Sequence, residues 1–160
     1  MPEHTLHLDR TRLEALIGRD AADALWALPV RYRRQAAAAR AAASADGADA
    51  ADGANTEADG HAHAEADGGE TRIVEIFIRR FSAATRPWIK MHADVAAVTV
   101  NVALTSEQDS PGGSLLTVYD GAVRAVDRRA GDATVHPSSL LHGVSRMHEG
   151  ERYTLILFFE

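Results

Sequence analysis

Three side chains in the second half of the sequence have the types and spacing of a metal centre. His92 and Asp94 form a His-x-Asp pair, and His142 follows them on a later predicted strand. The pair alone carries little information, because eight histidines in 160 residues make chance pairs common, and a second pair occurs at His7 and Asp9. Two imidazoles and one carboxylate on one face of a metal, however, form the facial triad that suits non-heme Fe(II) and leaves coordination positions open.

Two further residues have the chemistry to hold a ligand beside this centre. Arg152 lies ten residues after His142, at the predicted start of the last strand, where a buried guanidinium can bind a carboxylate through two hydrogen bonds. Asn101 lies within an otherwise apolar strand, and a buried amide requires hydrogen-bond partners. We predict functional roles for both, against the alternatives of a surface arginine and a structural amide network.

Eight short strands are predicted to position these residues. From Thr71 onward the sequence is rich in β-branched and aromatic residues, and short glycine-containing turns divide it. Closely spaced short strands of this kind are typical of an all-β barrel or sandwich. The predicted strands are 71–81, 88–91, 97–104, 114–119, 122–127, 132–135, 140–144 and 152–159.

The N-terminal part predicts helices instead. Apolar residues from Leu13 onward share a helical face over 9–35, and Asp9 or Thr11 has the chemistry of an N-cap. Pro29 predicts a break between two short helices.

Residues 36–70 have the composition of an insert. This tract contains no Val, Ile, Leu, Met or aromatic residue, and it carries eight acidic residues. Its Ala-rich start (35–45) has the propensity to continue a helix, but the repeated Asp-Gly steps that follow would break it. We predict a disordered acidic insert between an N-terminal helical segment (1–35) and a β domain (71–160).

The composition excludes several classes of function. The absence of cysteine excludes a disulfide scaffold, a thiolate zinc site and a cysteine nucleophile. The net charge of −6 arises in the insert, and no basic stripe is present, so no nucleic-acid partner is expected. The N-terminus lacks the apolar stretch of a signal peptide, and no apolar run approaches the roughly 20 residues that span a bilayer. We therefore expect no membrane partner and a cytoplasmic location.

Together these motifs resemble the Fe(II)/2-oxoglutarate-dependent dioxygenases, specifically the prolyl and lysyl hydroxylase branch. The sequence resembles the lysyl hydroxylase catalytic domain in particular, because that domain has a comparable TxNxAL strand and His-Pro segment. The resemblance runs from about Ile73 to Phe159. Its segments are FIRRF at 77–81, HAD at 92–94, TVNVAL at 99–104, GG at 112–113, HP at 136–137, His142 and EGERY at 149–153.

The resemblance implies a mainly β fold, the double-stranded β-helix or jelly roll, and a role for each matching residue. His92, Asp94 and His142 would bind Fe(II) and form the catalytic centre. Arg152 would hold the distal carboxylate of 2-oxoglutarate, and Asn101 would contact the same cosubstrate. Ascorbate is an optional further cofactor.

Two positions depart from the family pattern. Phe81 stands where lysyl hydroxylases often have tyrosine, so the hydroxyl that would donate to the cosubstrate is missing. Pro111 stands where an acidic residue commonly precedes the Gly-Gly pair. Both departures bear on how active the enzyme is.

The implied activity is hydroxylation of a C–H bond in a peptidyl (prolyl- or lysyl-like) or small-molecule substrate, with consumption of O2 and release of succinate and CO2. Two alternatives stay open. A cupin-type metalloenzyme that does not use 2-oxoglutarate would need the triad but not Arg152 or Asn101. A non-catalytic β-barrel binding module would tolerate the loss of His92 or Asp94 without a chemical consequence.

The remaining polar residues near these motifs have a simpler interpretation. His136 competes with His142 as a ligand, but only His142 lies ten residues before Arg152, so we predict a structural role for His136. Several arginines are predicted to be solvated charges on strand faces or turns, although a few of them could face an acidic substrate. They are Arg79, Arg80, Arg124, Arg128 and Arg129.

Overall fold

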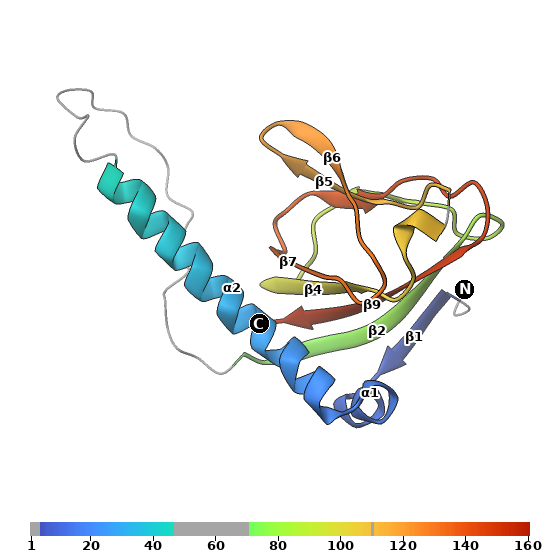
Figure 1. Cartoon of the computed structure of the whole chain (residues 1–160), viewed down its shortest axis with the longest axis horizontal. Coiled ribbons are helices and arrows are strands. Elements are labelled where there is room, and N and C mark those ends of the chain that lie inside the picture. Colours follow the sequence, from blue (N-terminus) through green and yellow to red (C-terminus); the bar gives the residue numbers. More distant parts are fainter. Residues whose placement is uncertain (1–3, 47–70, 110) are drawn as a thin grey trace.

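Two antiparallel sheets face each other in the computed structural model, which describes residues 4–46, 71–109 and 111–160 (Figure 1). The larger sheet has the order β1-β2-β9-β4-β7 and the smaller one β3-β8-β5-β6. The strands of the larger sheet are β1 (Thr5–Leu8), β2 (Ile73–Ser82), β9 (Glu151–Phe159), β4 (Val98–Ala103) and β7 (Ala133–Pro137). Those of the smaller sheet are β3 (Ile89–His92), β8 (His142–Val144), β5 (Leu115–Tyr119) and β6 (Ala122–Val126).

All eight predicted strands are present, and the arrangement confirms the predicted double-stranded β-helix. Strand β1 was not predicted, and it extends the larger sheet by pairing antiparallel with β2. This strand has only four residues (TLHL), and a segment so short has too few positions for a period-two pattern to stand out.

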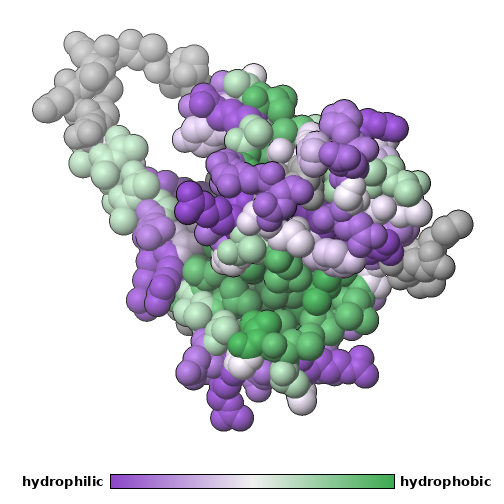
Figure 2. Space-filling model, turned by 45° about the vertical axis from the view of Figure 1, so that its right-hand side comes forward, coloured by the Kyte–Doolittle hydropathy of each residue, from purple (hydrophilic) through white to green (hydrophobic). Residues whose placement is uncertain are grey.

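The core lies between the larger sheet and the N-terminal helices. All six residues of β4 are buried, because one face of the strand looks into the space between the sheets and the other looks toward the helices. On the helical side, Val98, Val100 and Val102 pack with Leu157 and Leu13. In the space-filling view, hydrophobic residues gather in the lower part of the visible face, and hydrophilic residues dominate above them (Figure 2).

Two helices, α1 (Arg10–Ile17) and α2 (Arg19–Asp46), lie against the buried side of the larger sheet. The predicted cap is confirmed at Asp9, whose side chain accepts a hydrogen bond from Arg12 N at 2.7 Å. The predicted break at Pro29 is wrong, because α2 passes through it as one helix of 28 residues. Trp26 and Tyr32 pack against the core on either side of the proline, and such packing offsets the lost hydrogen bond.

Helix α2 also includes residues 36–46, which the sequence analysis placed in the insert. Their high alanine content gives the best intrinsic helix propensity, so the helix continues without a core beneath it. The rest of the predicted insert, 47–70, lies outside the described residues. Neither helix combines the length and the apolar composition that a membrane span in the described part of the chain would need.

Candidate metal centre

The pairing of β3 with β8 brings the two predicted histidine ligands together. His92 ends β3, His142 begins β8, and the two residues are direct partners in the antiparallel register. Their ring centroids lie 4.4 Å apart. Gly143 permits this close pairing, because a Cβ at that position would lie 2.9 Å from the Ile89 carbonyl oxygen. The residue next to His142 is therefore a glycine for steric reasons.

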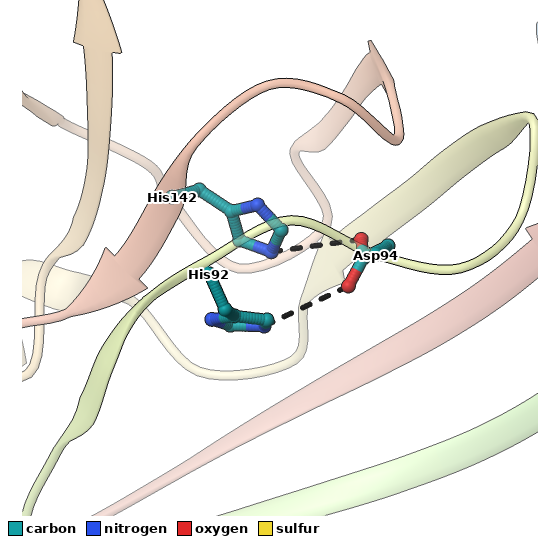
Figure 3. Close-up of side chains that lie close together, drawn as sticks. All are labelled: His92, Asp94 and His142. Atoms are coloured by element: carbon teal, nitrogen blue, oxygen red, sulfur yellow. Dashed lines mark ion pairs between the residues drawn. The ribbon is translucent and has the colours of Figure 1, made fainter.

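Asp94 completes the group from the segment that follows β3. Its backbone N–H donates to Ser138 O at 2.8 Å, which anchors this segment beside β7. Figure 3 shows both imidazole rings directed at the carboxylate, with 3.6 Å from His92 Nε2 to Asp94 Oδ1 and 3.6 Å from His142 Nε2 to Asp94 Oδ2. One ligand atom from each of the three residues lies within 4.8 Å of the others.

Backbone carbonyls orient both imidazoles for metal binding. His92 Nδ1 lies 2.9 Å from Lys90 O, and His142 Nδ1 lies 3.0 Å from Leu140 O. A carbonyl only accepts, so each Nδ1 carries a hydrogen, and Nε2 is the nitrogen that faces Asp94 and could bind a metal. A metal-binding histidine commonly uses its second nitrogen in this way.

The carboxylate is oriented by a hydroxyl from β4. Thr99 Oγ1 donates to Asp94 Oδ2 at 2.6 Å, and Thr99 itself is 1% exposed. Two imidazole nitrogens and a carboxylate thus converge on one point. The donor set, two imidazole nitrogens and one carboxylate, fits Fe(II).

The triad lies in the wall of a cavity of about 270 Å³ between the two sheets. The cavity is also lined by the two predicted cosubstrate residues, Arg152 and Asn101. Its remaining walls are largely apolar and come from both sheets. They include Phe77, Phe81, Ile89, Leu115, Val144, Ile156 and Phe158.

Arg152 is buried deeply in this cavity, at 1% exposure. Its guanidinium carbon lies 5.3 Å from the centroid of the Phe81 ring, so this aromatic residue packs on the cation without needing a hydroxyl. Gly113 adopts a φ of +73°, and a Cβ there would come within 2.8 Å of Met147 Cγ and 3.7 Å of Arg152 Cδ. Gly113 therefore leaves room for the Met147 side chain, which a Cβ at this position would displace.

Asn101 takes part in a buried network that the sequence did not reveal. Its Oδ1 accepts from Arg128 Nη1 at 2.8 Å and from Thr154 Oγ1 at 2.6 Å. The prediction that Arg128 is a solvated charge is wrong, because this side chain is 2% exposed. The sequence around Arg128 and Arg129 does not indicate that the Arg128 side chain is directed into the protein interior. A contact between Asn101 and a cosubstrate stays a prediction.

Removal of the Arg128 side chain should destabilise the fold. Arg128→Ala loses a charge-assisted hydrogen bond to a buried amide and leaves a void, so we expect unfolding free energy to fall by about 2–3 kcal/mol. Urea denaturation measures this loss. The control is Arg129→Ala, which changes the exposed neighbour. An unchanged urea midpoint for Arg128→Ala would contradict the structural role.

His136 lies beside the triad but outside the group of three. Its ring centroid is 4.8 Å from that of His142, and its Nδ1 lies 3.0 Å from Pro137 O. Burial is the main cause that lowers the pKa of His136. The neutral ring therefore packs against His142.

The chain is similar to known proteins in structure, although not in sequence. No family model matches the sequence, and no curated protein matches it. An oxidoreductase of the 2OG-Fe(II) oxygenase family from Burkholderia pseudomallei matches with a TM-score of 0.51 and 21% identity, over 59% of this chain and 47% of its own. EvdMO1 matches with a TM-score of 0.50 and 19% identity, over 57% of this chain and 27% of its own.

A third match is a prolyl hydroxylase in complex with a hypoxia inducible factor peptide fragment from Trichoplax adhaerens. Its TM-score is 0.47 at 20% identity, over 57% of this chain and 46% of that one. The aligned part of this chain thus corresponds to about half the length of the first and third of these proteins, and to about a quarter of EvdMO1. The first of these likenesses concerns the fold, and it shows that the chain has the fold of that 2OG-Fe(II) oxygenase.

Proposed function

We propose that this protein is an Fe(II)- and 2-oxoglutarate-dependent dioxygenase that hydroxylates a C–H bond of a peptidyl or small-molecule substrate. The observation that carries the proposal is the convergence of His92, Asp94 and His142 on one point in a cavity that also contains Arg152. The fold, which is that of the 2OG-Fe(II) oxygenases, supports it independently.

Each residue would have a defined task. His92 Nε2, His142 Nε2 and the Asp94 carboxylate would hold the metal on one side, with positions left open toward the cavity. Arg152 would bind the distal carboxylate of 2-oxoglutarate through its planar fork. Bound Fe(II) and 2-oxoglutarate would supply the activation of O2 and the oxidising power for C–H hydroxylation, with succinate and CO2 as the other products.

The surroundings suit this chemistry electrostatically. The negative charges of Asp94 and of 2-oxoglutarate would balance the positive charges of Fe(II) and Arg152, so the loaded centre would be neutral overall. The apolar walls would exclude water from the reacting atoms, which strengthens every charge interaction inside and limits side reactions.

The position of Arg152 also separates this function from the cupin-type alternative. A cupin-type enzyme without 2-oxoglutarate would not need a cation in the same cavity as the triad. Arg152 lines the same cavity as the triad and is 1% exposed, as a residue that binds the cosubstrate carboxylate there would be.

An anaerobic titration tests the proposal. Metal-free protein receives Fe(II) and then increasing 2-oxoglutarate, and we expect a visible metal-to-ligand charge-transfer band. The band should be missing in His142→Ala and unchanged in His148→Ala, which removes an exposed histidine outside the triad. Tight iron binding without a band would favour the cupin-type enzyme. No iron binding at all would leave only the binding module.

A further inference from the structure

We infer that Arg79 binds a carboxylate of the primary substrate, and that the substrate is therefore a carboxylic acid with an apolar body. The inference rests on the proposed function, because it concerns the part of the cavity that the metal and the cosubstrate would leave open. It goes beyond that function by assigning a substrate class and the residue that selects it.

Arg79 faces the cavity from the middle of β2. The residues Glu75, Phe77, Arg79 and Phe81 alternate along this strand and all line the cavity wall. The guanidinium carbon of Arg79 lies 4.9 Å from the centroid of the Phe77 ring. This stacking fixes the side chain over the apolar wall and leaves its hydrogen-bond donors for another group.

Arg79 has no directly paired protein group within the described residues. Arg79 forms no ion pair and no hydrogen bond there, and its Nε is buried without a partner. The carboxylate on the same face of the strand, Glu75, is instead 3.0 Å from His7 Nδ1. Burying a donor without a partner is costly, so such a cation at a ligand cavity indicates a ligand that offsets the cost.

A second arginine adds to the local positive charge. Arg86 Nε is also buried without a partner among the described residues. Burial, and after it the charge of Arg86, lowers the pKa of Arg79. With the loaded metal centre neutral, the charges of Arg79, Glu75 and the Arg86 that acts on Arg79 sum to one positive charge. One carboxylate balances it.

The other side chains near Arg79 determine which kind of group the rest of the substrate carries. Phe77 and Phe158 form an edge-to-face pair with centroids 5.4 Å apart, and Ile156 lines the same wall. These side chains offer contact to an alkyl or aryl group rather than to a sugar or a nucleotide. A cavity of about 270 Å³ is also small, so it suits a compact acid.

Calorimetry on the loaded protein tests the inference. Anaerobic protein with Fe(II) and saturating 2-oxoglutarate is titrated with straight-chain acids from propanoate to decanoate and with phenylacetate, each against its primary amide. Because 2-oxoglutarate already occupies Arg152, a second acid reports on another cation. We expect at least one acid to bind about 10- to 100-fold more tightly than its amide.

The variants locate the binding. Arg79→Gln should abolish the preference for the acid and leave amide binding unchanged, whereas Arg79→Lys should keep part of it. The matched control is Arg80→Gln, which removes the adjacent arginine that pairs with Glu151 on the opposite face. The binding acid should also increase succinate release, and Arg79→Gln should raise its KM more than it lowers kcat.

Three results would overturn the inference while leaving the proposed function intact. They are equal binding of acids and amides, acid binding that survives Arg79→Gln, and no acid binding in protein that shows the charge-transfer band. Absence of the band itself overturns the proposed function and, with it, the assignment of Arg79. The two failures are therefore distinguishable.

Discussion

Asp94→Ala should lower the affinity for Fe(II) by at least about 100-fold and abolish turnover. Changes in the partners of a metal ligand already cost about 10- to 100-fold, and this change removes a ligand itself. Asp94 also supplies the only negative charge among the three ligands, so the variant would leave two neutral imidazoles, which hold a dication weakly. Anaerobic competition against a coloured chelator measures the affinity.

The hydroxyl behind the carboxylate provides a graded control. Thr99→Val removes the donor at 2.6 Å from Asp94 Oδ2 but keeps the ligand, so its loss of affinity should be intermediate, about 10-fold. Added Fe(II) should raise the Tm of the wild type, raise that of Thr99→Val less, and leave that of Asp94→Ala unchanged. Wild-type iron affinity in Asp94→Ala would remove the triad as the metal site.

Much of the fold follows from the sequence because strand signals are local. The segment 97–104 alternates regularly, and β4 forms there. The structure agrees with all eight expected strands, and their turns contain glycines that adopt positive φ, such as Gly121 at +69° and Gly150 at +74°. Steric rules of this kind act on neighbouring residues, so they can be read without the tertiary structure.

The predictions from sequence are wrong at positions whose structure depends on residues distant in the chain. Pro29 is tolerated because side chains on both sides of it pack on the sheet, which no helical window reveals. Arg128 is buried because β4 supplies an amide acceptor from a strand 27 residues earlier. In sequence, Arg128 and the exposed Arg129 are equivalent, and only the pairing of the strands distinguishes them.

The candidate site shows the same division. The residue types and the context of His92, Asp94 and His142 predicted a triad, and the structure brings the three together. The groups that surround and orient these three side chains could not be predicted from the sequence. The carbonyls that fix both Nδ1 atoms and the hydroxyl of Thr99 depend on the strand pairing, and so does the buried wall on which Arg79 lies.

Arg152→Gln should separate cosubstrate binding from metal binding. Fe(II) affinity should stay at the wild-type value, because the guanidinium is not a ligand. The KM for 2-oxoglutarate should rise about 30-fold or more, since loss of a buried charged partner costs on the order of 2–5 kcal/mol. Succinate release at varied 2-oxoglutarate measures the KM, and the charge-transfer band should need correspondingly more 2-oxoglutarate.

A lysine variant at position 152 tests whether the planar shape of the guanidinium is needed in addition to its charge. Arg152→Lys keeps the charge but loses the planar fork and the stacking on Phe81, so we expect only partial recovery. Arg146→Gln changes an exposed arginine nearby and should have no effect. If Arg152→Gln turns over with the wild-type KM for 2-oxoglutarate, the cosubstrate carboxylate is held elsewhere. Arg79 would then be the next cation to test, because it is the other arginine among the described residues that line the cavity.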